Sequence, residues 1–385
     1  MNLKIISVLF FLISLAHGTI SAVEHEKVKV LFVVEKFPYS LQTFIINQMT
    51  GLIDRGFDIK IFAQIAPDSF MPDVLQPYDF TDRVFYRSVP SGQGDFDIIL
   101  CQLGGSASRC LSLIHKKMLS GKLLVCFRGY DLSGYIKFYR NAYDEVMKKA
   151  DLLLPVCDYF ADRLRSMGAP SNKVITHHSS IDLKKFAFKE RSIGPDNVIH
   201  LITVCRLVEM KGLEYAIRAV AQVARAHENI EYTIVGGGDL YDSLVQVIEE
   251  LGMNNKIKLV GRKAHEEVVQ LLDQSHIFIH PSITAKNGSQ EGIPNGIQEA
   301  MAMGLPVVST YHSGIPELVE HGVSGLLAPE KDVAMLAEHL LYLIKHPDRW
   351  AAMGRAGRAK IEQAFDMEKE NDILAKLLLS VVSNA

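Results

Sequence analysis

The chain has 385 residues, of which 48% are hydrophobic, and it carries a formal net charge of -3 at pH 7. This length exceeds one ordinary core, so we expect two domains, and the charge balance lacks the basic stripe typical of nucleic-acid-binding proteins. The five cysteines show no C-x-x-C spacing, which argues against both a disulfide framework and a zinc site.

Residues 1–23 form an apolar N-terminal extension. The stretch 5–23 contains no Asp, Glu, Lys or Arg. Three interpretations stay open for it: a signal peptide, a membrane anchor, and an extension that is poorly ordered or lies at the membrane interface. Because we expect reduced thiols, we favour a cytoplasmic location, which includes the cytoplasmic face of the inner membrane. The apolar segment leaves an anchor or export open.

An alternation of strand and helix signals begins at Lys27 and predicts an α/β fold of doubly wound parallel sheets. We place the N-terminal domain at 24–190 and expect its stretch 67–94, rich in Pro, Asp and Gly, to be irregular. The strands expected in this domain are 28–34, 59–63, 98–101, 122–127 and 152–156. The helices expected are 41–55, one that follows residue 131 and ends at 149, and 158–168. Residues 173–176 are the last segment expected in this domain.

The segment 184–197 lacks apolar periodicity and is expected to link this half to a C-terminal domain at 191–366. The strands expected there are 198–205, 232–235, 257–260, 277–280 and 307–310. The helices expected there are one from 212 to 226, 266–274, 333–344 and 350–365. A C-terminal helix at 367–385 is a candidate to cross back onto the first domain.

Three loops of the first domain follow strands, so they are expected to face the ligand crevice of an open α/β sheet. They are 35–40, the Gly-rich turn 102–105, and 128–131. We expect no metal site. Asp95 and Asp97 form a D-x-D sequence, but it directly precedes a strand and is interpreted as a solvated strand entry. His177 and His178 are adjacent, so they point to opposite sides of an extended chain and are poor metal ligands as a pair.

The stretch 290–320 sets two carboxylates, Glu291 and Glu299, around the start of a helix. Pro294 suits the first turn of that helix and Gly304 its end. The free N–H groups and the positive dipole of the helix start favour an anionic ligand. Carboxylates that accept from sugar hydroxyls, beside a helix end that binds phosphate, predict a nucleotide-sugar site.

The loop after the strand 198–205 carries Arg206 and Lys211. Two cations five residues apart in such a loop are suited to clamp a diphosphate, although both could equally be solvated residues at a helix start. The turn Gly236-Gly237-Gly238-Asp239 lacks the full G-x-G-x-x-G pattern, so a dinucleotide fingerprint is not supported.

These residues together resemble the retaining, nucleotide-sugar-dependent glycosyltransferases of group 1, of the GT4 type. The E-x7-E signature matches Glu291 and Glu299, and R-x4-K matches Arg206 and Lys211. The resemblance covers roughly residues 28–380. It implies the GT-B fold, in which two Rossmann-like domains face a central cleft. Within the group, the sequences around Glu35-Lys36-Phe37-Pro38 and 281–291 look most like bacterial exopolysaccharide enzymes of the colanic acid and amylovoran type.

The resemblance implies that a hexose moves from a UDP- or GDP-sugar to a saccharide or lipid-linked acceptor with retention, by front-face attack, without metal or cofactor. The residues with an implied catalytic role are Arg206, Lys211, Glu291 and Arg128. Those implied to bind the donor are Glu299, Gly292, Ile293, Pro294, Asn295, Gly236 and Arg262. Those implied on the acceptor side are Gln42, Thr43, Gln102, Gly104 and Asp131. Peripheral membrane association is left open, and no nucleic acid is expected as a partner.

Three positions depart from the family pattern, all in the first domain. Relatives commonly carry Glu at Gln42, His at Gln102 and His at Arg128, where the family His contacts the donor sugar near the reacting carbon. Arg128 is a permanent cation, so a change in donor choice or in acceptor charge is expected. These departures motivate the alternative of a non-catalytic nucleotide-sugar-binding protein of the same fold. An epimerase of this fold is disfavoured by the combined R-x4-K and E-x7-E patterns.

Overall fold

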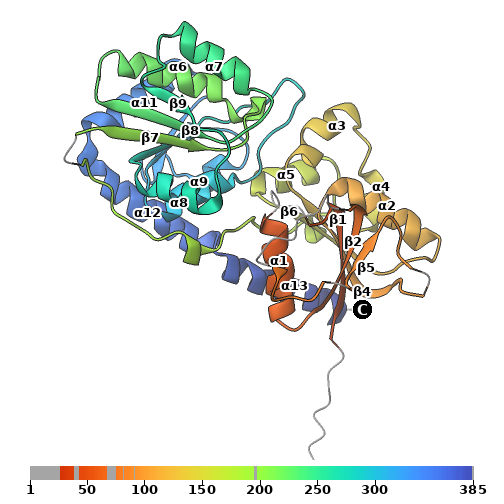
Figure 1. Ribbon diagram of the computed structural model, residues 1–385. Helices are drawn as coiled ribbons and strands as arrows, with labels where there is room; N and C mark the ends of the chain where they lie inside the picture. Colours follow the sequence, from red (N-terminus) through yellow and green to blue (C-terminus); the bar gives the residue numbers. More distant parts are fainter. Residues whose placement is uncertain are drawn as a thin grey trace, which may run out of the picture.

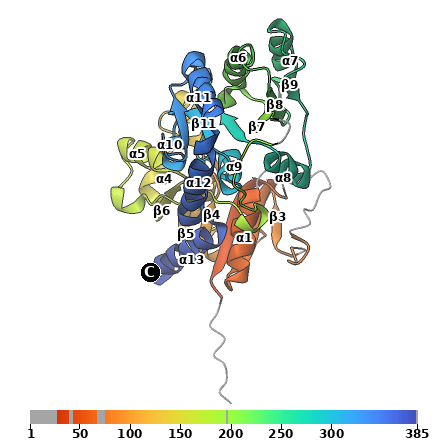
Figure 2. The same cartoon turned by 90° about the vertical axis from the view of Figure 1, so that its left-hand side faces the viewer.

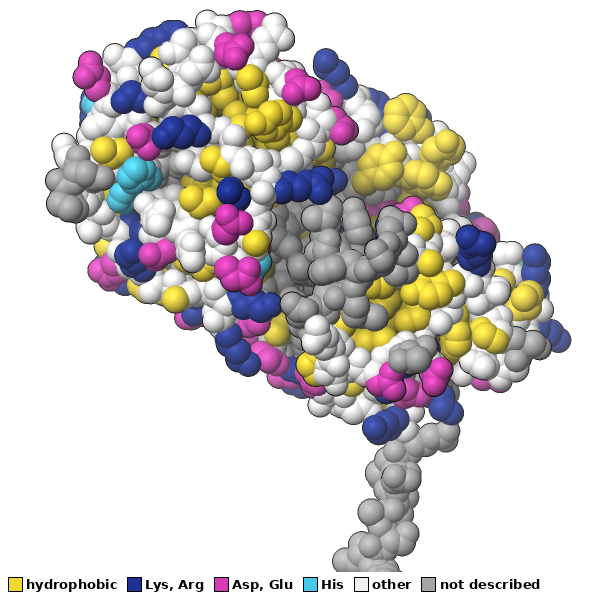
Figure 3. All heavy atoms as spheres, in the orientation of Figure 1, with side chains coloured by type: hydrophobic (Ala, Val, Ile, Leu, Met, Phe, Trp, Pro, Cys, Tyr) yellow, Lys and Arg dark blue, Asp and Glu magenta, His cyan; other side chains and the backbone are white. Residues whose placement is uncertain are grey.

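The computed structural model describes residues 27–38, 43–66, 75–80, 82–90, 92–194 and 197–383. The expectations for residues 1–23 and for Gln42 therefore lie outside the described residues. Among the described helices, none is both long and apolar enough to cross a membrane. Lysine, arginine and acidic side chains are interspersed over the face seen in Figure 3 rather than gathered into a basic stripe.

The first of two parallel sheets is built from buried apolar strands. Its strands are β1 (Lys29–Lys36), β2 (Asp58–Ile65), β3 (Val84–Tyr86), β4 (Asp95–Cys101), β5 (Ser120–Phe127) and β6 (Leu152–Pro155). Their spatial order is β3-β2-β1-β4-β5-β6. In β1, Val30 to Val34 are almost fully buried on both faces, as expected where helices cover both sides of a parallel sheet.

Alternate residues of the first sheet pack against different helices. The helices of this part are α1 (Thr43–Asp54), α2 (Gly104–His115), α3 (Gly134–Phe138), α4 (Asp144–Lys149) and α5 (Asp158–Ser166). Val30 and Phe32 face α1, and Leu31 and Val33 face the layer of α2, α4 and α5. Figure 1 shows these two layers around the sheet.

The second sheet repeats this plan. Its strands are β7 (Ile199–Val204), β8 (Ile230–Val235), β9 (Ile257–Leu259), β10 (Ile277–His280), β11 (Val307–Thr310) and β12 (Gly325–Ala328), in the order β12-β11-β10-β7-β8-β9. Its helices are α6 (Leu213–Ala224), α7 (Tyr241–Glu250), α8 (His265–Asp273), α9 (Asn295–Ala302), α10 (Ile315–Leu318), α11 (Val333–Lys345) and α12 (Trp350–Ala364). Helices α6, α7 and α11 cover one face, and α8, α9 and α12 the other.

The last helix, α13 (Met367–Ser383), returns to the first domain and packs against α1. Leu374 and Leu378 are buried in the same cluster as Met49 and Leu52, and Figures 1 and 2 both show α13 beside α1. At the point of return, the N–H of Ile181 donates to the carbonyl of Phe365 at 3.1 Å, and the N–H of Met367 donates to Ile181 at 3.1 Å. The two segments that connect the domains therefore lie side by side.

Several expected elements are wrong. The helix predicted to end at residue 149 is broken into α3 and α4, because Tyr143 between them turns into the core against Phe127, with ring centroids 5.4 Å apart. The stretch expected to be irregular contains β3, which pairs with β2. Strand β12, which was not predicted, forms the edge of the second sheet beside β11.

Candidate active site

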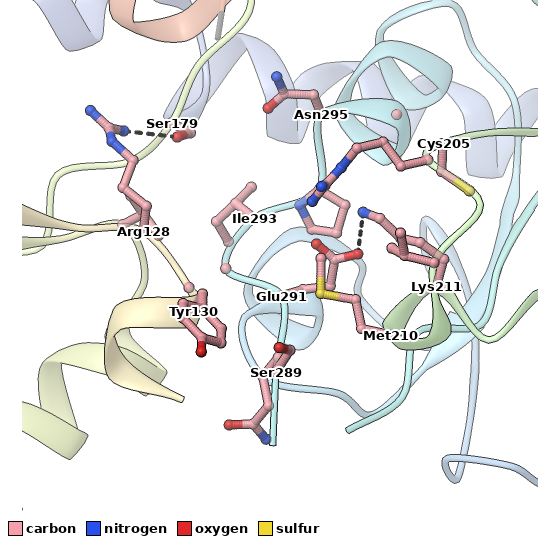
Figure 4. A pocket seen from close by; sticks show the side chains of 18 of the residues that line it. Arg128, Tyr130, Ser179, Cys205, Met210, Lys211, Ser289, Glu291, Ile293 and Asn295 are labelled. Carbon is pink, nitrogen blue, oxygen red and sulfur yellow. Dashed lines mark hydrogen bonds and ion pairs between the residues drawn. The ribbon is translucent and has the colours of Figure 1, made fainter. Parts of the chain in front are cut away.

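A cavity of about 910 Å³ lies between the two domains and is lined by residues of both. It opens at the carboxyl ends of the strands, because its walls come from the loops after β1, β4, β5, β7 and β10. This is where open α/β sheets bind ligands. Figure 4 shows Arg128 on one side of the cavity, Lys211 on the other, and Ile293 between them.

Glu291 is held by an ion pair with Lys211 and by two further hydrogen bonds. Its carboxylate accepts from the hydroxyl of Ser282 at 3.2 Å and from Nε2 of His280 at 3.4 Å. Burial alone would raise the pKa of Glu291, but the Lys211 ammonium and His280 together lower that pKa well below its usual range. The ion pair with Lys211 therefore favours the carboxylate form of Glu291.

The backbone of Glu291 is fixed from the loop after β11. Its N–H donates to Nε2 of His312 at 3.0 Å, and Nδ1 of His312 lies 2.5 Å from Oε1 of Glu330. Glu330 also accepts from the N–H of Thr284 at 2.8 Å. This arrangement places the proton of His312 on Nδ1, and it orients the loop that carries Glu291.

Lys211 is placed by a tight turn that only glycine can complete. Gly212 has a φ of +63°, and a Cβ on it would lie 2.0 Å from the carbonyl oxygen of Pro281. Left-handed backbone and close approach are the two conditions that favour glycine. Lys211 belongs to the loop after β7 and is 9% exposed. The turn places its side chain against the loop after β10, where it meets Glu291. Arg206 lines the same cavity at the end of β7.

Helix α9 points its first turn at this cavity. It begins at Asn295, and Pro294 is the residue before it, with φ -71° and ψ 120°, so the prediction that Pro294 lies in the first turn is wrong by one residue. Gly296 approaches β7 closely, because a Cβ there would lie 2.6 Å from the carbonyl of Val204. Ile297 and Gln298 already donate to the Pro294 carbonyl, each at 3.2 Å, so the N–H groups of Asn295 and Gly296 are those left for an anion at this helix start.

Glu299 lies on α9 and lines the cavity one turn beyond the helix start. Burial raises the pKa of Glu299 to about 7. No hydrogen bond or ion pair to its carboxylate is found within the described residues, in contrast to Glu291. Glu299 is thus a carboxylate with free acceptor capacity facing the cavity.

Arg128 contributes the cation of the opposite wall. Its guanidinium donates to Gln48 at 2.9 Å, to Ser179 at 3.2 Å and to Gln102, and it lies 4.4 Å from the ring centroid of Phe44. Burial lowers the pKa of Arg128 from its ordinary value. All these hydrogen-bonding partners are neutral.

Comparison with known proteins decides the family. The family model described as Glycosyl transferases group 1 matches residues 184–360. The amylovoran biosynthesis glycosyltransferase AmsK of Erwinia amylovora is 33% identical over 403 residues, covering 91% of this chain and 99% of its own. This chain is a group 1 glycosyltransferase. The putative colanic acid biosynthesis glycosyltransferase WcaL of Escherichia coli is 31% identical over 403 residues, with 91% and 99% covered.

Solved structures of glycosyltransferases share the fold. Anabaena HepE, solved with UDP and glucose, has a TM-score of 0.74 at 22% identity and covers 92% of this chain and 100% of its own. Sucrose-phosphate synthase of Thermosynechococcus elongatus has a TM-score of 0.76 at 16% identity, with 93% and 100% covered. The predicted GT-B architecture is confirmed.

The cavity of this glycosyltransferase gathers ten of the sixteen residues predicted for the site. They are Arg206, Lys211, Glu291, Arg128, Glu299, Gly292, Ile293, Pro294, Asn295 and Gln102. Their chemical roles stay predictions. The side chain of Thr43, like Gln42, lies outside the described residues.

Four predicted site residues do not line the cavity. Asp131 lies behind the wall, where its carboxylate accepts from the N–H groups of Arg128, Gly129, Leu132 and Gly104. Asp131 and Gly104 thus shape the loop of this glycosyltransferase instead of facing an acceptor. Gly236 packs against the carbonyl of Cys205, and Arg262 is exposed beside Gly237.

Residues that hold the site residues in place were not predicted. Gln48 and Ser179 bind Arg128, His280 and Ser282 bind Glu291, and His312 binds the Glu291 backbone. The only sequence signal of the last three is position, since His280 ends β10, Ser282 follows β10 and His312 follows β11. Gln48 lies within a helix, and nothing in its local pattern distinguishes it from a solvated residue.

Proposed function

We propose that the protein transfers a hexose with retention from a UDP- or GDP-sugar to a saccharide or lipid-linked acceptor in exopolysaccharide assembly, on the cytoplasmic side. The observation that carries the proposal is the convergence of Arg206, Lys211, Glu291 and Glu299 with the start of α9 on one interdomain cavity. Cations and free N–H groups suit a diphosphate, and carboxylates suit sugar hydroxyls.

The names of the relatives support this class of substrate. AmsK is named for amylovoran biosynthesis and WcaL for colanic acid biosynthesis. HepE was also solved with UDP-glucose. A Corynebacterium glutamicum mannosyltransferase, named as GDP-mannose-dependent, is 28% identical over 69% of this chain. Both donor bases therefore occur among proteins similar to this one.

In the proposed reaction, the bond between sugar C1 and the β-phosphate oxygen breaks, and a bond from C1 to the acceptor hydroxyl oxygen forms on the same face. The hydroxyl proton passes to the departing diphosphate, so no protein base is needed. Arg206, Lys211 and the start of α9 stabilise the charge on that diphosphate. Glu291 orients sugar hydroxyls and Glu299 accepts from the ribose hydroxyls, which makes catalysis mainly positioning. Neither metal nor cofactor takes part in this scheme.

The test is a panel of UDP- and GDP-sugars, first for a rise in melting temperature and then for release of nucleotide. NMR of the product from the active donor reports the anomeric configuration. Loss of turnover in Lys211→Ala and Glu299→Ala, with turnover retained in the surface variant Lys263→Ala, supports the proposal. Full turnover in the first two variants contradicts it. Stabilisation by nucleotide sugars without any turnover indicates the non-catalytic binding protein that the departures at Gln102 and Arg128 suggest.

A further inference from the structure

Arg128 is a cation with no counter-charge inside the cavity. Within the described residues no carboxylate forms an ion pair with it, and its three hydrogen-bond acceptors are the side-chain oxygens of Gln48, Gln102 and Ser179. Taking a guanidinium out of water without an anion is costly. The part of the cavity wall formed by the first domain therefore carries a guanidinium without an ion-pair partner among the described residues.

The surrounding carboxylates are engaged elsewhere. Asp131 accepts four backbone N–H groups, and Glu291 is paired with Lys211. Glu370 accepts from the N–H of His178 at 3.2 Å. Glu35 lines the same cavity but is exposed and forms no ion pair with Arg128 in the described structure. The charge of Asp131 favours the charged form of Arg128, but none of these carboxylates forms an ion pair with the guanidinium within the described residues.

Hydrogen-bond donors also outnumber acceptors around Arg128. Its Nε–H and the amide nitrogen of Gln102 are both buried without a partner in the described structure, and Gln102 is 1% exposed. Buried donors of this kind need an explanation. These two nitrogens are enclosed, so a ligand in the cavity would meet the other guanidinium N–H groups of Arg128. An oxygen-rich anion offers them acceptors and brings no further donors.

The orientation of Gln48, one of the neutral partners of Arg128, is fixed by His177. The amide nitrogen of Gln48 lies 3.5 Å from Nδ1 of His177, whose Nε2 lies 3.0 Å from the carbonyl of Glu370. Burial lowers the pKa of His177 to about 4, so the ring is neutral and donates from Nε2. Nδ1 then accepts from the Gln48 amide, which turns the Gln48 oxygen toward Arg128. The guanidinium is preorganised rather than free to leave.

We propose that Arg128 selects a sugar bearing a carboxylate, such as a hexuronic acid, in this cavity. The proposal rests on the proposed function and deepens it. Arg128 lies across the cavity from Lys211 (Figure 4). Because the diphosphate is assigned to Arg206 and Lys211, we assign Arg128 to the sugar portion of the substrates. A carboxylate is the acidic group that sugars carry on carbon 6, and guanidinium–carboxylate contacts are among the strong charge-assisted hydrogen bonds. The acidic sugar is either the one transferred or the one that accepts.

The test uses donors that differ only at carbon 6. Affinities of wild type, Arg128→Gln and Arg128→Lys are measured for UDP-glucose against UDP-glucuronate, and for GDP-mannose against GDP-mannuronate. An acidic donor is expected to bind wild type at least about tenfold more tightly than its neutral counterpart. The preference for the acidic donor, expressed as the ratio of its affinity to that of the neutral donor, is expected to fall to one or below in Arg128→Gln. Arg128→Lys is expected to keep part of this preference. Arg109→Gln, the same change at an exposed arginine of α2 outside the cavity, is the matched control.

A second arm assigns the acid to the acceptor. With UDP or GDP bound, methyl glucuronide is compared with methyl glucoside, and an Arg128-dependent preference for the acid in this arm alone places the carboxylate on the acceptor. Preference for the neutral compound in both arms, or an acid preference unchanged in Arg128→Gln, overturns the proposal. UDP and GDP alone report on the nucleotide site, so failure of both to bind wild type refutes the proposed function itself. Circular dichroism of each variant verifies folding.

Discussion

The ammonium of Lys211 and the carboxylate of Glu291 form an ion pair that joins the loop after β7 to the loop after β10. Both side chains are nearly buried, with 9% and 7% of the residue surface exposed. Removing one member of such a pair leaves an uncompensated buried charge, whereas removing both charges together is often tolerated. The pair therefore has separable consequences for stability and for activity.

Lys211→Ala is expected to reduce kcat by about 10²- to 10³-fold and to destabilise the fold by roughly 3 kcal/mol. The double variant Lys211→Met with Glu291→Gln should recover most of the stability but none of the activity. Lys263→Ala breaks an exposed ion pair with Glu267 (3.2 Å) and should change stability by less than ~0.5 kcal/mol. Urea unfolding and initial rates measure both effects. A single variant as stable as wild type would contradict the buried-pair interpretation.

Donor affinity is expected to depend on pH through Glu299. Burial raises the pKa of Glu299 to about 7, and hydrogen bonds from ribose hydroxyls favour the ionised form. Binding should thus release a proton, so affinity falls by up to about tenfold per pH unit below 7 and levels off above it. Isothermal titration with UDP-glucose or GDP-mannose at several pH values measures the slope. In Glu299→Gln the slope should vanish, and an equal slope in both proteins would exclude Glu299 as its origin.

Glu370 is expected to make the protein less stable as pH rises. Burial raises the pKa of Glu370 from 4.5 to about 7, so its contribution is fully present below pH 4.5 and is lost as pH rises through 7. Glu370→Gln should therefore gain roughly 1–3 kcal/mol over wild type above pH 7 and nothing near pH 4.

His177 has the opposite effect on stability in both proteins. Burial lowers the pKa of His177 to about 4, so the stability that the neutral ring contributes is lost as pH falls. His177 also contacts Glu370, with Nε2 3.7 Å from the Glu370 carboxylate, so the difference between the two proteins reports on Glu370 together with this contact. Chemical denaturation at four pH values gives the curve. Glu338→Gln, an exposed change on α11, is the control, and a similar gain there would point to a general effect of charge.

Gly212→Ala and Gly252→Ala form a matched pair that separates a clash from backbone strain. Both glycines have left-handed backbones, with φ of +63° and +68°, but only at Gly212 would a Cβ meet another atom, the Pro281 carbonyl oxygen. Gly252→Ala should cost about 1 kcal/mol. Gly212→Ala should cost at least ~2 kcal/mol more and should lower kcat, because the turn carries Lys211. Equal losses of stability in the two variants would contradict the predicted clash, because they would show that the loop of Gly212 shifts to accommodate a Cβ.

Turnover is expected to persist after treatment with a chelator. In the proposed reaction, the cations Arg206 and Lys211, which line the cavity, would carry the charge of the diphosphate. Rates with excess EDTA should stay within about twofold of the untreated enzyme, which is below 0.5 kcal/mol in barrier height. Loss of activity that Mg²⁺ or Mn²⁺ restores would contradict this prediction.

The sequence was informative where apolar patterns are long and local. Strands β10 and β11 match their expected spans, and α11 differs by one residue, because each is a buried run or an amphipathic helix with clear ends. The meeting of Lys211 and Glu291 could be anticipated from loops at the carboxyl ends of parallel strands. Strand β12 was not predicted, because its run Gly325–Ala328 is short and opens on glycine.

The support around the site could not be read from the sequence. Gln48, Ser179 and His177 approach Arg128 or its partners from segments distant in the chain. Whether Asp131 faces a substrate or its own loop depends on four backbone N–H groups, which the sequence does not place. The break between α3 and α4 likewise depends on the ring packing of Tyr143 against Phe127.

The bridge between Ile181 and Asp366 joins the two chain crossings, which are also hydrogen-bonded to each other. Close to it, Glu317 of the second domain accepts from the N–H groups of Asp158 (2.8 Å) and Tyr159 (2.9 Å) at the start of α5. At the cavity, Gln290 of the second domain accepts from Arg163 at 2.8 Å, and its N–H donates to Ser133 at 3.0 Å. The domains are therefore tied both beside the crossings and at the cavity, so any widening of the cavity would have to break the Gln290 contacts.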